Sequence, residues 1–303
     1  MNIKKIARYT LAKHTTHGLD KKNAKLNGTI SSIGTERSYR QCYSNYLEWC
    51  KQNLVHPDFR ANRSTLVNYL EERREWIKQK TLNQERQSLQ LVYKQKLPYL
   101  HAIRESVYDK RSYTMTEVNS IVVHQTLKNA TTTWLAFYGG LRAHEPATIL
   151  PIEERPASSH RNWDSRRFNG LPPHRLYTVQ GKGKLVREVA IPLWLSIRLE
   201  KSRRITPIEI IDREIIYLSW YDVGIGQSWS QSFTSASKKA LQFSRGGHGL
   251  RHSFAKWRLQ HLIDWIECSN IKSEKHTNEE LALLLLSQLL GHFRLDIMYC
   301  YLR

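Results

Sequence analysis

The sequence predicts a mainly α-helical protein of two domains: a small N-terminal helical bundle, then a larger, mostly helical domain with a small antiparallel β-sheet. The chain has 303 residues, which is too long for one ordinary compact domain and suits two. Over most of its length, apolar residues recur at three- and four-residue steps, the spacing of one helix face. The stretch 175–191 differs, because two strand-like runs flank a Gly-Lys-Gly-Lys turn at 181–184, which indicates a hairpin.

The charge of the chain is unusual. It has 47 Lys and Arg residues against 27 Asp and Glu, a formal net charge of +20. Such a surface attracts polyanions, since neutralising phosphates releases their counterions. Nucleic acid is therefore the leading partner. The alternatives are a basic protein that is merely soluble, or one that lies on an anionic membrane surface.

The sequence also argues against several compartments and metal sites. The longest apolar run, 281–286, is far shorter than a membrane span, and the N-terminus has no apolar run of signal-peptide length. The four cysteines lack Cys-x-x-Cys spacing, so we expect reduced thiols. We therefore expect a cytoplasmic protein without a membrane partner, associated with the nucleoid when bound to DNA.

The first domain is expected at residues 29–105, after a basic arm at 1–28 that lacks apolar periodicity. The arm either contacts DNA or is simply solvated. Helices are predicted near 39–50, over Ser64–Ile77, and from Thr81, where Thr81 and Gln84 form a capping-box pattern. Cations predominate on the other helix faces. Together with Lys184 of the hairpin, those expected to contact DNA, rather than only solvent, are Arg37, Arg40, Arg73, Arg74, Lys80 and Arg86.

The second domain is expected at 106–303. Thr114 with Glu117, and Thr277 with Glu280, form capping-box patterns that open two of its helices. The hairpin at 175–191 is the one β-structure that we predict. The polar stretches Pro151–Pro173 and Asn270–His276 are expected to be surface loops.

Five short signals occur in order along this domain. They are Arg142-x-x-Glu145, Gly-Lys182-Gly, His248-x-x-Arg251, Leu-Gly-His292, and Tyr301 nine residues later. Each is weak alone, because a lone Arg is usually on the surface and a lone His or terminal Tyr is usually structural. Their order and spacing resemble the tyrosine recombinase (phage-integrase) family, and the N-terminal bundle is more loosely similar to that family's core-binding domain.

The resemblance implies a catalytic domain with the DNA breaking-rejoining fold. It also implies a catalytic set made of Arg142, Lys182, His248, Arg251, His292 and Tyr301, with Glu145 supporting Arg142.

The chemistry agrees with these residue types. Two planar guanidiniums can grip the oxygens of a phosphodiester without a metal or another cofactor. A phenol is a poor nucleophile at pH 7, so it needs a base or a positive field. His248 is the expected base, and His292 is expected to hydrogen-bond the phosphate or the nucleophile. Lys182 on the hairpin could protonate the leaving 5′-oxygen.

Two features near the end of the chain bear on this site. Tyr299 competes as nucleophile, because seven residues after His292 return to nearly the same helix face, whereas Tyr301 has the family spacing. Only Leu302 and Arg303 follow Tyr301, so we expect other segments to replace the C-terminal tail with which the family couples its subunits. His248 and His252 are four apart, but the Glu of a zinc-protease helix is missing between them, so we expect no metal there.

The expected function is site-specific cleavage and rejoining of double-stranded DNA through a 3′-phosphotyrosyl intermediate. The resemblance further implies a homotetramer on two synapsed sites, a possible accessory directionality factor, and integration or excision of a mobile element. The alternatives are a type IB topoisomerase-like or hairpin-forming strand transferase, and a catalytically silent DNA-binding protein of the same fold.

Overall fold

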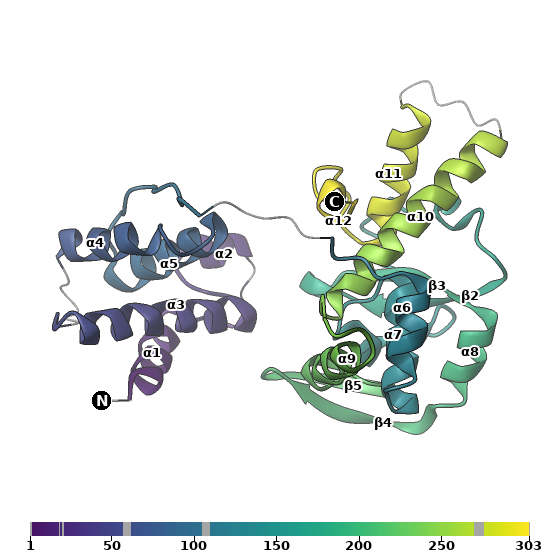
Figure 1. Cartoon of the computed structure of the whole chain (residues 1–303), viewed down its shortest axis with the longest axis horizontal. Coiled ribbons are helices and arrows are strands. Elements are labelled where there is room, and N and C mark those ends of the chain that lie inside the picture. Colours follow the sequence, from purple (N-terminus) through teal and green to yellow (C-terminus); the bar gives the residue numbers. More distant parts are fainter. Residues whose placement is uncertain are drawn as a thin grey trace. The chain divides into compact units, whose positions relative to one another are not determined.

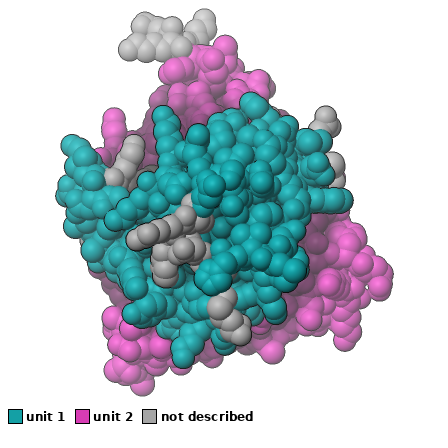
Figure 2. Space-filling view, turned by 90° about the vertical axis from the view of Figure 1, so that its left-hand side faces the viewer, with its two compact units in different colours: residues 1–108 teal, residues 109–303 magenta. Residues whose placement is uncertain are grey.

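The protein forms two compact units, residues 1–108 and 109–303, which are coloured separately in Figure 2. The computed structural model describes residues 2–17, 19, 21–56, 62–104, 110–269 and 276–302, without the side chains of Lys21, Lys25 and Lys182. The domain boundary expected at 105/106 lies outside these described residues, as do residues 270–275 of the expected polar loop.

The first unit is a helical bundle. Helix α1 packs against α3, and α3 and α4 pack against α5. Buried Tyr46, Leu47 and Leu70 belong to its single apolar core. The helices are α1 (Ile3–Ala12), α2 (Lys21–Leu26), α3 (Ile33–Gln52), α4 (Arg63–Arg73) and α5 (Gln79–Tyr93) (Figure 1).

The expectation of a basic arm without packed structure at 1–28 is wrong. Asn2 caps α1, and Ile3, Ala7 and Leu11 of this helix are buried in the bundle core. Their four-residue spacing is a helical one, but the cations and threonines between them hide it in the sequence. The first residues therefore help to build the bundle.

Two predicted helix ends in this unit also need correction. Helix α5 begins at Gln79 after Lys78, without a side-chain cap, so Thr81 lies inside its first turn. Helix α4 ends at Arg73 and does not reach Ile77. A capping-box pattern predicts a helix start, but hydrogen bonding along the backbone decides where that start lies.

The second unit surrounds a three-stranded antiparallel sheet in the order β1-β2-β3. Strands β2 and β3 form the predicted hairpin, which closes with Gln180 opposite Val186. The capping boxes of Thr114 with Glu117 and Thr277 with Glu280 are also present as predicted. The strands are β1 (Leu150–Pro151), β2 (His174–Gln180), β3 (Val186–Pro192), β4 (Arg203–Asp212) and β5 (Ile215–Tyr221).

Helices account for most of the rest of this unit. Helices α10 and α11 lie side by side, and α7 and α12 also pack on α10 (Figure 1). The α-helices are α6 (Met115–Val122), α7 (Leu127–Gly139), α8 (Leu193–Glu200), α9 (Gly226–Leu241), α10 (His248–Cys268), α11 (Asn278–Leu289) and α12 (Met298–Leu302), and the 3₁₀ turns are η1 (Glu145–Thr148), η2 (Ser165–Phe168) and η3 (Lys182–Lys184).

The expectation of one hairpin was incomplete, because β4 and β5 form a second, two-stranded sheet. Arg213 and Glu214 at its turn both have positive φ, a conformation usually signalled by Asn or Gly. The turn was missed because neither residue type stands there.

The segment 151–173 is anchored more firmly than a surface loop. Arg167 is buried and pairs with Glu188 of β3. Buried Arg258 of α10 donates to the carbonyls of Arg167 and Asn169, at 2.8 and 2.7 Å. Among the described helices, none is long and apolar enough to cross a membrane.

Candidate active site

Arg142 and Glu145 form the first part of the site, just after α7. Gly140 ends that helix in the left-handed conformation (φ +59°), and a Cβ there would collide with the ring of Phe254. The chain can therefore turn sharply into Arg142. The Arg142 guanidinium donates to Glu145 Oε1 at 2.7 Å, and its backbone N–H donates to Oε2 at 2.9 Å.

A third arginine, Arg187 of β3, reaches the same carboxylate. It is fully buried and donates to Glu145 Oε2 at 2.7 Å. Sequence reasoning missed this residue. The available signal was strand alternation, because Arg187 has the same parity as inward-facing Val189 and Ile191.

Arg251 lies in the first turn of α10 and is also fully buried. Its guanidinium donates to the carbonyls of Gly140 and Leu290, and its Nε lies 3.3 Å from the Tyr301 hydroxyl. The helix start, the end of α7 and the end of α11 therefore meet at one side chain.

His292 lies at the centre of the cluster. Its Nε2 is 3.2 Å from Arg142 Nη2 and 3.2 Å from the Tyr301 hydroxyl. An arginine can only donate, so Nε2 must be the unprotonated nitrogen of the ring and the proton belongs on Nδ1. The phenol can then donate its proton to His292.

The structure brings Tyr301 and not Tyr299 into the cluster. Tyr301 is 7% exposed and packs between α10 and α11, whereas Tyr299 on the same helix is 52% exposed. Helix α12 begins only at Met298, so His292 and the tyrosines are not on one continuous helix. The helical spacing that favoured Tyr299 therefore does not apply.

His248 and His252 border the phenol ring. The ring centroids of His248 and Tyr301 are 5.8 Å apart, and His252 Nδ1 lies 3.2 Å from the Tyr301 carbonyl. The imidazole within hydrogen-bonding distance of the hydroxyl is that of His292. His252 was considered before only as a metal ligand, yet here it holds the backbone of the α12 residue.

The hairpin turn lies next to the Arg142–Glu145 pair. A Cβ on Gly181 would lie 3.1 Å from Glu145 Oε1 and 3.6 Å from Arg142 Nη1. Lys182 follows Gly181 directly, although its side chain is outside the described part, and Lys184 is exposed. The backbone therefore brings the Lys182 position near the other candidates.

The site is strongly electropositive. Burial raises the pKa of Glu145, but Arg187, Arg251 and Arg142 outweigh it and hold that pKa well below its usual range. Desolvation and the repulsion of Arg142 and Arg187 lower the pKa of Arg251 to about 9. Three guanidiniums against one carboxylate leave an excess of positive charge for an anion.

Both histidines that face the arginines are neutral at pH 7. Desolvation, and then the Arg251 charge, lower the pKa of His248 to about 4 and that of His292 to about 4. His248 remains exposed at the edge of the site, while the surrounding protein and its charges act on one side of its ring. Neutral imidazoles can accept a proton, which is what a base requires.

The cations expected to contact DNA in the first unit differ in their surroundings. Arg73 is committed internally, because Nε and Nη2 both donate to buried Glu85 at 3.0 Å. Arg74 pairs with Glu71, and Arg40 pairs with Glu36. Those with fewer internal ties are exposed Arg37 and Lys80, and partly buried Arg86, which stacks on the ring of Tyr99.

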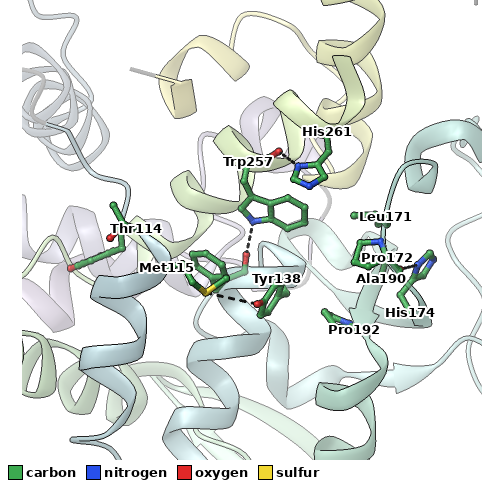
Figure 3. A pocket seen from close by; sticks show the side chains of 12 residues that line it. Thr114, Met115, Tyr138, Leu171, Pro172, His174, Ala190, Pro192, Trp257 and His261 are labelled. Atoms are coloured by element: carbon green, nitrogen blue, oxygen red, sulfur yellow. Dashed lines mark hydrogen bonds between the residues drawn. The ribbon is translucent and has the colours of Figure 1, made fainter. Parts of the chain in front are cut away.

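A separate apolar hollow of about 400 Å³ lies in the second unit. Figure 3 shows Trp257 and Tyr138 on its wall, with Leu171 and Pro172 opposite. Its lining residues include neither the buried arginines nor Tyr301. The polar cluster around His292 is therefore the stronger candidate for chemistry.

Solved structures show where this fold occurs. The chain is similar to XerH site-specific recombinase bound to difH substrate in a pre-cleavage complex, with 15% identity, a TM-score of 0.53, and coverage of 99% of this chain and 91% of that one. It is also similar to XerH in a post-cleavage complex with palindromic difH substrate, with 16% identity, a TM-score of 0.53, and coverage of 99% and 90%. No protein-family model and no curated protein sequence matches the chain. The chain has the fold of the tyrosine recombinases, as the resemblance implied.

Proposed function

We propose that this protein is a site-specific DNA recombinase that cleaves and rejoins strands through a covalent link to Tyr301. One observation carries the proposal: the Tyr301 hydroxyl lies 3.3 Å from Arg251 Nε and 3.2 Å from His292 Nε2, with Arg142 on the other side of that imidazole. A nucleophile, a base and two phosphate-binding cations are thus within contact of one another.

The proposed reaction is a transesterification. Tyr301 Oη attacks the phosphorus, its proton passes to His292 Nε2, and the bond from phosphorus to the 5′-oxygen breaks. Lys182 supplies the proton that the leaving 5′-oxygen takes up. The product is a 3′-phosphotyrosyl link and a free 5′-hydroxyl, and attack by a partner strand's 5′-hydroxyl reverses these steps without ATP.

His292 replaces His248 as the proposed base. His292 is within hydrogen-bonding distance of the phenol, while His248 lies at the exposed edge of the site, where it can bind a phosphate oxygen. Arg142 and Arg251 neutralise charge on the non-bridging oxygens, where it grows in the transition state. Arg251 also donates from Nε to the phenol oxygen, which favours the phenolate.

Double-stranded DNA is the proposed substrate. The charge of +20 and the electropositive site support it, and both XerH structures contain a difH substrate. Exchange of two duplexes would need four copies, one for each strand cut, and an accessory factor could set the direction. We place this activity on the bacterial type of nucleoid DNA, in the integration or excision of a mobile element.

Covalent capture tests the proposal. The protein is incubated with a pool of duplexes of random sequence, each carrying one nick, so that a cleaved end diffuses away and the adduct is trapped. Adducts are isolated under denaturing conditions, the DNA is sequenced, and the linked peptide is identified by mass spectrometry. We expect the linked residue to be Tyr301.

Two matched variants identify the nucleophile. Tyr301→Phe should abolish the adduct while DNA affinity stays nearly unchanged, because only the hydroxyl is lost. Tyr299→Phe, two residues away and exposed, should form the adduct normally. An adduct with Tyr301→Phe, or failure of the wild type to form one with any duplex of the pool, would refute the proposal.

A supercoiled plasmid carrying one captured site separates recombination from its closest alternative. A type IB topoisomerase-like enzyme would relax the plasmid without a partner site. A recombinase should give joined products only when a second site is present.

A further inference from the structure

Arg187 is buried in the middle of the site, although the proposed chemistry assigns it no step. Its guanidinium donates to three acceptors: the Glu145 carboxylate at 2.7 Å, the Leu289 carbonyl at 2.7 Å, and the Gly140 carbonyl at 3.3 Å. These acceptors belong to three segments that are far apart in the sequence. A buried cation with such partners is costly unless the fold keeps all of them in place.

The three acceptors each lead to a residue of the site. Glu145 holds Arg142 through both a side-chain and a backbone hydrogen bond. Gly140 begins the turn that carries Arg142, and Leu289 ends the helix before His292. Arg187 therefore touches the supports of a phosphate-binding arginine and of the proposed base.

Arg251 makes a parallel set of contacts. It also donates to the Gly140 carbonyl, and to the carbonyl of Leu290 next to Leu289. The two arginines thus tie the end of α7 to the end of α11 at two adjacent points. A Cβ on Gly291 would lie 3.2 Å from Arg187 Cδ, so Arg187 also packs against the turn that presents His292.

We infer that Arg187 is a positioning residue for strand transfer, which acts through Glu145 and the 289–292 turn to hold Arg142 and His292 against the scissile phosphate. This inference rests on the proposed function. Because Arg187 is fully buried, it should not contact DNA, and its loss should slow the chemical step with little effect on DNA affinity.

The test compares two buried arginines of the same unit. Arg187→Gln removes the charge inside the site. Arg258→Gln removes an equally buried charge whose hydrogen bonds go to the carbonyls of Arg167 and Asn169 and not to the site. For each variant, we would measure thermal unfolding, affinity for a duplex recovered by covalent capture, and the single-turnover rate of adduct formation on that duplex.

Arg187→Gln should lower the rate of adduct formation roughly 10- to 100-fold, the scale found when a partner behind a reactive group is lost. Its DNA affinity should stay within about threefold of the wild type. Arg258→Gln should lose stability but keep its rate within about threefold. Equal rate losses in the two variants, or a wild-type rate for folded Arg187→Gln, would overturn the inference.

Arg187→Lys covers the case in which Arg187→Gln does not fold. It keeps the charge but can make fewer directed hydrogen bonds, so its rate should fall between those of Arg187→Gln and the wild type. If neither variant folds, Arg187 serves the fold alone and the inference is also overturned.

A double variant shows whether Arg187 acts through Glu145. If it does, Glu145→Gln with Arg187→Gln should be no slower than the slower single variant, within about threefold. Multiplying rate losses would exclude the route through Glu145. A wild type that forms no adduct refutes the proposed function, whereas a wild type and Arg187 variants that react equally well refute only the role of Arg187.

Discussion

Glu145 shows at the scale of one residue how this site stores positive charge. Its carboxylate is fully buried, and burial alone would favour the protonated form. Arg142 and Arg187 bind one oxygen each, so the charged form prevails. Without this single acid, the arginines would repel one another in a place that water does not reach.

His292 should make stability depend on pH. Its pKa is about 4 in the folded protein and about 6.5 in the unfolded chain, so below pH 6.5 the unfolded chain takes up a proton first. The free energy of unfolding should therefore decrease as pH falls from 6.5 toward 4. His292→Gln should show a smaller decrease over this range in urea denaturation at several pH values.

His124→Gln is the control for this prediction, because His124 is an exposed histidine of the same unit. It should retain the pH dependence of the wild type. A His292→Gln profile parallel to the wild type would show that the arginines around His292 do not suppress its protonation.

At the scale of the element, the β2–β3 hairpin delivers a lysine to the phosphate. Lys182→Met should slow cleavage roughly 100-fold, because the 5′-oxygen would leave without a proton. A duplex with sulfur in place of that oxygen needs no proton on leaving, so it should react equally fast with the variant and the wild type. The measurement is the single-turnover rate on both duplexes.

Lys184→Met serves as the matched change on the same hairpin, since Lys184 is exposed two residues away. Its rate on the oxygen duplex should stay near that of the wild type. If the sulfur duplex fails to rescue Lys182→Met, the lysine has another role, such as binding the phosphate.

Helix α1 offers a second prediction about an element. Leu11 is fully buried in the bundle, so Leu11→Ala should destabilise the first unit by about 2–5 kcal/mol. Leu26→Ala, on the neighbouring α2 at a side chain that is 75% exposed, should cost less than about 0.5 kcal/mol. Hydrogen exchange of the α3 amides in the full chain would measure both, and equal effects would restore the view of 1–28 as an unpacked arm.

For the whole molecule, the charge of +20 makes a prediction about binding. DNA affinity should fall on the order of a thousandfold between 50 and 200 mM salt, because each neutralised phosphate releases counterions. Affinity for a labelled duplex across this range is the measurement. A flat dependence would mean that base contacts, and not the net charge, provide the binding energy.

The sequence by itself determined the kind of fold, most helix positions, and the five short signals of the second domain. These are local properties: helical spacing, capping boxes and a Gly-rich turn depend on neighbours within a few residues. The β4–β5 turn and helix α1 escaped because their local residues did not carry the usual signals.

Only the tertiary structure decided how the site is assembled. It placed Tyr301 and not Tyr299 against Arg251, and His292 and not His248 beside the hydroxyl. It also added Arg187, whose single local trace was the alternation of a strand. The reason is physical: these contacts join residues some 40 to 150 positions apart, and no local spacing encodes which polar groups meet when the helix ends pack together.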